Sequence, residues 1–211
     1  MNDGEFEAER HKMVERQIRA RGILEPRVLA AMAKVPRHLF VPDDMMAFAY
    51  ADEPLPIGEN QTISQPYIVA YMTEALKLEG HEKVLEVGTG SGYQTAVLAE
   101  LAREVCTVEI VESLSLRAQD ILRALGYRNI RFAVGDGSKG WPELAPFEGI
   151  IVTAAAARVP EPLENQLAPA GTLITPVGTD VQELMLVRNG KKGLTRERLI
   201  PVRFVPLVYT H

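Results

Sequence analysis

The segment Glu86-Val87-Gly88-Thr89-Gly90-Ser91-Gly92 lies between a predicted strand at residues 83–87 and a predicted helix at residues 93–101. Glycines let a backbone turn tightly and let a ligand approach the main chain, and the N-terminus of the following helix offers unpaired N–H groups. In doubly wound sheets, ligands bind at this carboxyl edge. Three glycines at alternate positions exceed what a tight turn without a ligand requires. The segment therefore predicts a nucleotide-type site.

Strands and helices alternate along the chain after residue 65. We expect helices at residues 66–76, 93–101 and 112–125, and strands at residues 83–87, 104–109, 129–134, 147–152, 171–177, 183–188 and 195–205. Strand–helix units of this length are typical of a mostly parallel sheet with helices on both faces. The sequence therefore predicts an α/β fold with a doubly wound, seven-stranded sheet and an N-terminal helical extension.

The chain before residue 65 has a different pattern. Apolar residues at helical spacing predict helices at residues 5–21, 27–34 and 43–50. Residues 52–64 contain two prolines and a glycine, which predict an irregular loop, and ordered loops of this length tend to be functional. We expect one domain over residues 1–211, in which residues 1–76 form a helical extension and a lid, and residues 77–211 form the α/β core.

Acidic residues lie at the ends of the first three strands of the predicted sheet. Glu109 follows the loop by about 20 residues, where a carboxylate accepts hydrogen bonds from the ribose of NAD or of S-adenosylmethionine. Asp136 can accept a hydrogen bond from an adenine amino group, although a plain Asp-Gly turn is the alternative. Together with Glu86, these acids favour a cationic ligand, because a sulfonium is attracted where a pyrophosphate is repelled.

The spacing of the glycines separates cofactor classes. The dinucleotide fingerprint is G-x-G-x-x-G, whereas Gly92 comes one residue early and Tyr93 holds the expected position. A nicotinamide oxidoreductase is therefore disfavoured, and a P-loop is disfavoured because no Lys-Ser/Thr pair follows. From the residues alone, a methyltransferase of small molecules and a non-catalytic nucleotide-binding module stay open, whereas the acidic charge disfavours an RNA methyltransferase.

The composition excludes several classes of protein. The 211 residues include 23 Lys plus Arg and 28 Asp plus Glu, and the net charge of −5 disfavours nucleic-acid and anionic-membrane partners. Cys106 is the single cysteine, so an intramolecular disulfide and a cysteine-rich metal site are excluded, and we expect no metal. Residues 1–21 lack the apolar core of a signal peptide, and no apolar run reaches the ~20 residues of a membrane span. We expect a soluble, cytoplasmic protein.

Several further motifs are spread over nearly the whole chain. They are Val35-Pro36-Arg37, Phe40-Val41, Leu55-Pro56-Ile57-Gly58, Gln61-Thr62-Ile63-Ser64-Gln65-Pro66, residues 84–95, Gly135-Asp136-Gly137, residues 151–155, residues 173–178 and Arg203-Phe204-Val205-Pro206-Leu207. Together they resemble the protein-L-isoaspartate O-methyltransferase family of protein-repair enzymes. The glycine-rich loop is shared by many families, whereas residues 61–66 and 203–207 are much more specific to this one. Relatives often have Ala-Pro-His after the serine, so a role of that histidine cannot be carried over to Tyr67.

The resemblance implies a Rossmann-like fold and a methyl transfer from S-adenosyl-L-methionine, which leaves S-adenosyl-L-homocysteine. The implied substrates are damaged proteins and peptides, methylated at the free α-carboxylate of L-isoaspartyl residues. By position, Ser64 is the active-site serine, and Thr62, Ser64 and Val205 bind the substrate. With the residues discussed above, the expected cofactor-binding set is Gln61, Thr62, Ile63, Ser64, Glu86, Gly88, Gly90, Ser91, Gly92, Glu109, Asp136, Gly137 and Thr153.

The chemistry of the implied substrate assigns Ser64 an orienting role. An α-carboxyl group has a pKa of about 3.5 in solution, so it is ionised at neutral pH and needs no general base. Ser64 and Thr62 are expected to donate hydrogen bonds to it, and no histidine is near Ser64 in the sequence. An N-cap before Pro66 is an alternative role for Ser64. We expect the protein to act as a monomer.

Overall fold

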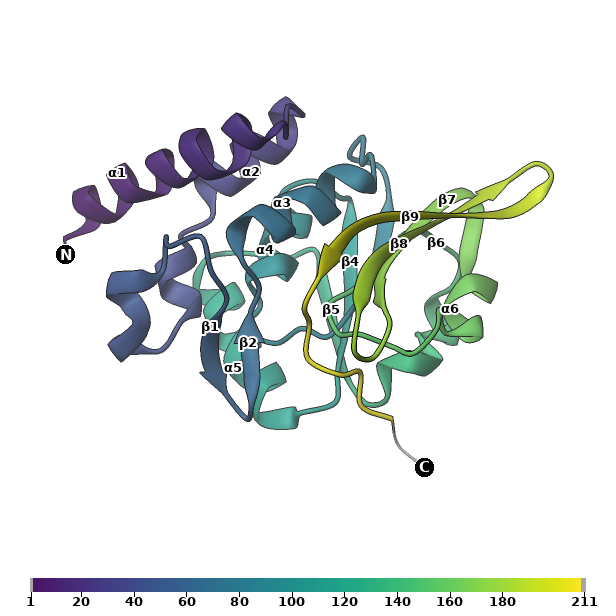
Figure 1. The fold of residues 1–211 in the computed structure, drawn as a ribbon. Helices are drawn as coiled ribbons and strands as arrows, with labels where there is room; N and C mark the ends of the chain where they lie inside the picture. Colours follow the sequence, from purple (N-terminus) through teal and green to yellow (C-terminus); the bar gives the residue numbers. More distant parts are fainter. Residues whose placement is uncertain (1, 210–211) are drawn as a thin grey trace.

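The centre of the fold is a seven-stranded sheet, and the computed structural model describes residues 2–209 (Figure 1). Its strands are β3 (Lys83–Val87), β4 (Glu104–Glu109), β5 (Ile130–Val134), β6 (Phe147–Val152), β7 (Leu167–Val177), β8 (Gln182–Gly190) and β9 (Gly193–Val202). The strand order is β5-β4-β3-β6-β7-β8-β9. The first five strands of this order pair in parallel, and β8 and β9 are added antiparallel. The predicted fold class is confirmed.

Helices cover both faces of the sheet. Successive side chains of a strand point to opposite faces, so a strand of buried residues gives each face an apolar surface that must be covered. On one face, Val84 and Val105 belong to the hydrophobic cluster of α3 (Pro66–Ala75), α4 (Tyr93–Ala99) and α5 (Glu112–Ala124). On the other face, Leu85 and Cys106 belong to a cluster with α6 (Glu161–Asn165), which the sequence did not predict because it is only five residues long. Within residues 2–209, no helix combines the length and the apolar character needed to cross a membrane.

The N-terminal helices lie on the first of these faces. α1 (Asp3–Met13) continues through a π-helical segment, η1 (Val14–Ile18), and a 3-10 turn, η2 (Arg19–Arg21). Gly22 ends this continuous helix at φ +93°, a left-handed conformation that glycine adopts without strain. α2 (Pro26–Lys34), η3 (Arg37–Phe40) and η4 (Asp43–Phe48) follow. These elements confirm the predicted helical positions, although the helix predicted at residues 43–50 is the 3-10 helix η4.

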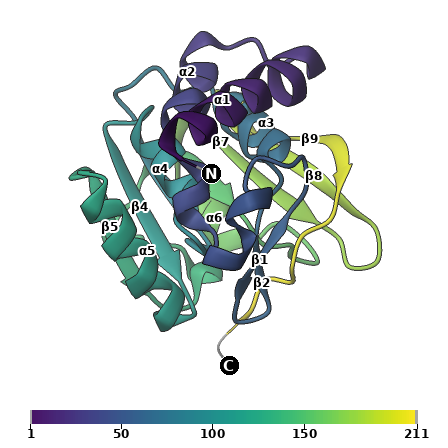
Figure 2. The ribbon, with the colours of Figure 1, turned by 90° about the vertical axis from the view of Figure 1, so that its left-hand side faces the viewer.

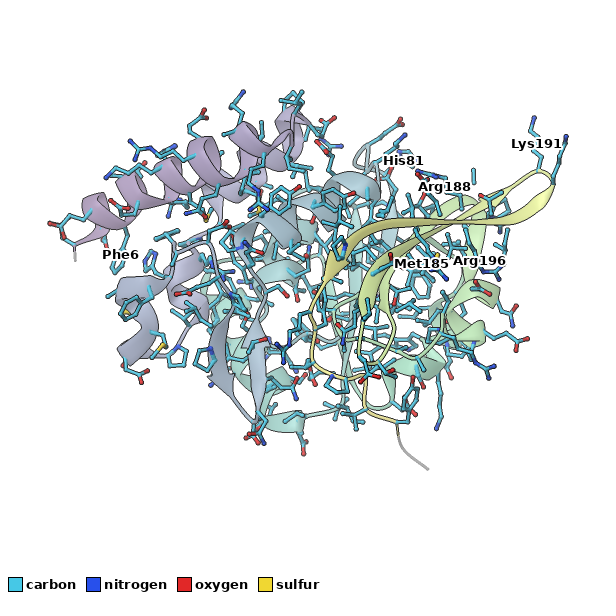
Figure 3. All side chains as sticks on the ribbon, viewed as in Figure 1. Phe6, His81, Met185, Arg188, Lys191 and Arg196 are labelled. Atoms are coloured by element: carbon cyan, nitrogen blue, oxygen red, sulfur yellow. The ribbon has the colours of Figure 1, made fainter. Side chains whose placement is uncertain are left out.

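A stacked aromatic contact attaches α1 to the rest of the extension. Phe6 lies beneath α1, on the side facing the body of the molecule (Figure 3). Its ring stacks on His38 of η3, with the ring centroids 4.0 Å apart. The His38 Nδ1 atom is 2.8 Å from the Tyr50 hydroxyl. The only histidine buried among the described residues is therefore used in packing.

The segment predicted as an irregular loop, residues 52–64, is a hairpin in the structure. β1 (Leu55–Gly58) and β2 (Gln61–Ile63) pair antiparallel, so the prediction was wrong for these residues. Glu59 and Asn60 form the turn with φ of 53° and 56°, the left-handed conformation of a tight two-residue hairpin. Pro56 is compatible with this two-stranded unit because both strands are edge strands, where a missing N–H is tolerated.

The order of the strands determines where a ligand can bind. The chain runs outward from β3 to β4 and β5, then returns to place β6 on the other side of β3. A crevice at the carboxyl ends of β3 and β6 follows from this reversal, and such switch points are the usual ligand sites of doubly wound sheets. Figures 1 and 2 show the β1–β2 hairpin and the C-terminal segment after β9 side by side near this edge.

Candidate active site

A pocket lies at the switch point, between the carboxyl edge of the sheet, the β1–β2 hairpin and the C-terminal segment. Most of the residues predicted to bind a cofactor line it: Gln61, Thr62, Ile63, Ser64, Gly88, Gly90, Ser91, Glu109, Gly137 and Thr153. Its wall also includes Val69, Val87, Thr89, Tyr93, Gln94, Val108, Ile110, Ala154 and residues 205–208. Several of these additional residues lie at the carboxyl ends of strands, so the topology could have identified them, whereas Val69 and Gln94 come from helices and carry no such signal.

The glycine-rich loop leaves no room for a side chain at Gly88, which lines the pocket. Gly88 has φ +94°, and a Cβ atom there would lie 2.3 Å from the Thr153 hydroxyl oxygen. That hydroxyl donates a hydrogen bond to the Gly88 carbonyl at 2.7 Å, so the end of β6 holds the loop. Gly92 has a different role, because it does not line the pocket, and a Cβ atom there would lie 3.1 Å from Cβ of Ala118 on α5. The structure thus shows a role of Gly92 in helix packing, and its cofactor contact stays a prediction.

Glu109 lies in the wall of the pocket at the end of β4. Its side chain is buried, and its two carboxylate oxygens accept hydrogen bonds from the backbone N–H groups of Gly90 at 2.8 Å and of Val111 at 3.0 Å. Carboxylate oxygens have two lone pairs each, so further acceptor capacity remains for hydroxyl groups of a ligand. The position agrees with the predicted ribose contact, and the same carboxylate fixes the loop at Gly90.

The structure places Glu86 behind the pocket rather than in its wall. Its side chain is fully buried, and one carboxyl oxygen accepts hydrogen bonds from the hydroxyls of Thr95 at 2.5 Å and Thr107 at 2.7 Å. Burial raises the pKa of Glu86 to about 8; these two hydrogen bonds oppose the shift, and the nearby Glu109 adds to it. Glu86 is therefore mainly neutral at pH 7 and holds β3, β4 and α4 together.

Stability should depend on pH through Glu86. Because its pKa in the folded state lies above the unfolded value of 4.5, the stabilising effect is complete below pH 4.5 and is lost as the pH rises through about 8. The expected slope is at most ~1.4 kcal/mol per pH unit inside this window. Glu86→Gln keeps an acceptor for both threonines but cannot ionise, so its unfolding free energy should fall less between pH 5 and 8.5. Urea denaturation across this range measures both proteins, and equal slopes would contradict the assignment.

The loop after β5 brings Gly137 to the pocket, and Asp136 supports it from behind. A Cβ atom on Gly137 would lie 2.4 Å from a methyl group of Val87, so only glycine fits. Asp136 does not line the pocket; its carboxylate accepts hydrogen bonds from the Ser138 backbone N–H at 3.0 Å and hydroxyl at 2.6 Å, and it contacts Lys139. The adenine contact of Asp136 stays a prediction, whereas its role in capping the η5 turn (Gly137–Lys139) is observed.

A second cleft adjoins the first. It is lined by Pro54, Thr62, Ser64, Gln65, Ile68, Thr153 and residues 201–205. Thr62, Ser64, Thr153 and Val205 belong to both clefts, so two ligands bound side by side would meet at these residues. The structure thus brings together all three residues predicted to bind the substrate.

Ser64 is not used for helix capping. The N-cap of α3 is Gln65, which makes no side-chain capping hydrogen bond, so the alternative role for Ser64 is not observed. None of His11, His38 and His81 lines either cleft, and His211 lies outside the described residues. Among the described residues of the site, no histidine is therefore placed to activate Ser64 as a nucleophile.

The fold and the two adjoining clefts are those of a Rossmann-like methyltransferase. A sequence model of the protein-L-isoaspartate(D-aspartate) O-methyltransferase family matches residues 8–211. A protein-L-isoaspartate O-methyltransferase from Picosynechococcus is 57% identical over 198 residues, which cover 94% of this chain and 89% of that protein. The chain therefore belongs to the protein-L-isoaspartate(D-aspartate) O-methyltransferase family.

Solved structures of this family have the same fold. One protein-L-isoaspartate O-methyltransferase superposes with a TM-score of 0.85 at 27% identity over 93% of this chain, which spans 65% of that longer chain. A structure from Plasmodium falciparum, assigned to the family and bound to S-adenosyl-L-homocysteine, superposes with a TM-score of 0.84 at 26% identity. It matches 95% of this chain and 99% of its own.

Proposed function

We infer that the protein transfers a methyl group from S-adenosyl-L-methionine to the free α-carboxylate of L-isoaspartyl residues in damaged proteins and peptides. The observation that carries this function is the junction of the two clefts at Thr62, Ser64, Thr153 and Val205. Membership of the family and the S-adenosyl-L-homocysteine bound by the Plasmodium relative support the same donor.

The first cleft fits the methyl donor. Gly88 and Gly137 form a surface without side chains, against which a nucleoside can lie directly on the backbone. We propose that Glu109 accepts hydrogen bonds from the ribose hydroxyls and that residues 61–64 cover the donor from the hairpin. When bound, S-adenosyl-L-methionine supplies a methyl group on a positively charged sulfur. The carboxylate of Glu109 gives this part of the pocket the complementary charge.

The second cleft is proposed to hold the isoaspartyl residue. Its α-carboxylate is already ionised at neutral pH, so the chain has no proton to remove before the transfer. The hydroxyls of Thr62 and Ser64 and the backbone N–H of Val205 donate no hydrogen bond to any acceptor within residues 2–209, and all three residues line both clefts. We propose that these donors hold one carboxylate oxygen in line with the methyl group. Orientation of this kind can supply up to ~7–11 kcal/mol of the barrier reduction.

The balance of the reaction requires no further reactant. A carboxylate oxygen forms the new bond to the methyl carbon, and the electron pair of the broken carbon–sulfur bond stays on sulfur. In the methyl ester, methoxide is a far better leaving group than the oxide of a free carboxylate. The neighbouring backbone amide nitrogen can therefore attack the ester carbonyl and close a succinimide without the enzyme, and the methoxide leaves with the amide proton as methanol. We also propose that residues 1–76 act as a lid-bearing extension and that the protein acts as a monomer.

A paired peptide assay tests the function. Two peptides of identical composition, one with an L-isoaspartyl and one with a normal aspartyl residue, are incubated with S-adenosyl-L-methionine labelled in the methyl group. We expect base-labile methyl ester on the isoaspartyl peptide alone. Equal labelling of both peptides, or no labelling of either while the protein binds the donor, would contradict the function and favour a different acceptor or a non-catalytic module.

A further inference from the structure

A side chain of β8 holds the C-terminal segment that covers the second cleft. This segment, residues 203–208, which we call the strap, follows β9 and belongs to no strand of the sheet. Its backbone contacts the loop after β6 at Ala155, whose N–H donates to the Val205 carbonyl at 2.8 Å and whose carbonyl accepts from the Leu207 N–H at 2.7 Å. Nearer to β9, the strap is bonded to Gln182.

Gln182 forms two hydrogen bonds with the backbone of a single residue. Its side-chain oxygen accepts from the Phe204 N–H at 2.6 Å, and its side-chain nitrogen donates to the Phe204 carbonyl at 3.2 Å. The Gln182 backbone already pairs with Val202 at the end of the β8–β9 ladder. Phe204 lies two residues beyond Val202 and has no strand partner of its own within residues 2–209. The Gln182 side-chain amide takes the place of that partner and bonds to both the N–H and the carbonyl of Phe204.

The next residue after this fixed position lies in the active site. Val205 lines both clefts. Its carbonyl accepts a hydrogen bond from the Ala155 N–H, and the residue before it, Phe204, is bonded to Gln182. The Val205 N–H belongs to the same peptide group as the Phe204 carbonyl that accepts from Gln182. Rotation of that peptide group would change the direction of the Val205 N–H, so the direction of this donor depends on the Gln182 amide.

We propose that Gln182 is a positioning residue for the peptide substrate, because it orients the Val205 N–H towards the second cleft. The proposal rests on the proposed function insofar as the ligand of that cleft is an isoaspartyl peptide. Gln182 itself lines neither cleft, so its effect on the substrate passes through the strap.

Gln166 provides a comparison on the opposite side of the site. Its side-chain oxygen accepts from the Trp141 N–H at 2.8 Å and its nitrogen donates to the Lys139 carbonyl at 2.8 Å, which holds the loop that carries Gly137. The same kind of double contact thus supports the cofactor side. Loss of Gln166 should weaken cofactor binding, whereas loss of Gln182 should weaken peptide binding.

The experiment compares Gln182→Met, Gln182→Glu, Gln166→Met and Gln119→Met with the natural protein. Methionine has a similar length without the hydrogen bonds, glutamate keeps only the acceptor, and Gln119 on α5 bonds only to side chains of its own helix. For Gln182→Met we expect the KM of the isoaspartyl peptide to rise about tenfold, with a smaller change in kcat and a dissociation constant of S-adenosyl-L-homocysteine within about twofold. Gln182→Glu should be intermediate, and Gln119→Met unchanged.

Hydrogen exchange gives a readout that does not depend on turnover. In Gln182→Met, the Phe204 amide should exchange faster, while the Gly88 and Gly90 amides keep their rates. Titration of the isoaspartyl peptide into the S-adenosyl-L-homocysteine complex should show the same tenfold weakening. If the natural protein binds this peptide but does not methylate it, the proposed function fails. The titration still tests whether Gln182 positions the bound peptide.

Three results would overturn the proposal. One is an unchanged peptide affinity in Gln182→Met together with faster exchange at Phe204, which would leave Gln182 a purely structural role. Another is an equal loss of peptide and cofactor affinity, which would mean that the substitution disturbs the whole fold. The third is a natural protein that binds isoaspartyl and aspartyl peptides equally weakly, because the second cleft would then hold a different ligand.

Discussion

Replacement of Glu109 by alanine is expected to lower the affinity for S-adenosyl-L-methionine and S-adenosyl-L-homocysteine roughly 10- to 100-fold. Hydrogen bonds to a charged group contribute ~1.5–3 kcal/mol, and this carboxylate is proposed to accept bonds from the ribose. The same substitution leaves the Gly90 and Val111 N–H groups without their acceptor, so the glycine-rich loop also loses its fixed position. Isothermal titration with both nucleosides measures the effect.

Two further variants separate these contributions. Glu109→Gln can still accept from the Gly90 N–H but has lost the charge, so it should bind more tightly than Glu109→Ala and less tightly than the natural protein. Glu112→Ala removes an exposed carboxylate at the start of α5 and serves as the control for charge alone. An unaltered titration curve for Glu109→Ala would exclude the ribose contact.

Replacement of Ser64 by alanine is expected to lower kcat/KM for an isoaspartyl peptide roughly 10- to 100-fold, because one hydrogen bond to the substrate carboxylate contributes ~1.5–3 kcal/mol. Binding of S-adenosyl-L-homocysteine should stay within a few-fold, since the substitution does not change the hairpin backbone that is proposed to cover the cofactor. Initial rates of methyl transfer and a nucleoside titration on the same preparation test both statements.

The size of the loss also distinguishes the roles of Ser64. An orienting residue leaves slow but measurable turnover, whereas removal of a covalent nucleophile lowers kcat by up to about 10⁶-fold. Thr195→Ala, which deletes an exposed hydroxyl on β9, is the matched control and should keep full activity. Unchanged turnover in Ser64→Ala would contradict an orienting role.

Much of the fold followed from local patterns. The strands β3, β4 and β6 have the bounds that the sequence predicts, because each is buried on nearly every side chain and is rich in apolar and β-branched residues. The β1–β2 hairpin was missed for the opposite reason. Its turn uses Glu59 and Asn60 in the left-handed conformation, where no Asn-Gly or Asp-Gly signal marks it, and contacts with α5 stabilise it.

The candidate site likewise has a part that the sequence identified and a part that only the structure shows. The lining glycines, Glu109 and the residues of the hairpin were identified from motifs and from the resemblance. Glu86 and Gly92 belong to the same motif, but the Glu86 side chain accepts hydrogen bonds from Thr95 of α4 and Thr107 of β4, and Gly92 packs against α5. A motif states which residues occur together, whereas the direction of each side chain depends on the twist of the strand and on the helix packed behind it.

The sequence by itself determined the α/β class, the alternation of strands and helices in the core and the position of the glycine-rich loop, because these depend on periodicity and on residues close together in the chain. The methyltransferase family was indicated by the resemblance of its motifs. Only the tertiary structure decided that two clefts share Thr62, Ser64, Thr153 and Val205, and that Gln182 holds the strap. Residues 62, 153, 182 and 205 are far apart along the chain. They meet because the return of the chain to β6, next to β3, and the antiparallel β8–β9 hairpin bring the C-terminal segment back to the carboxyl edge of the sheet.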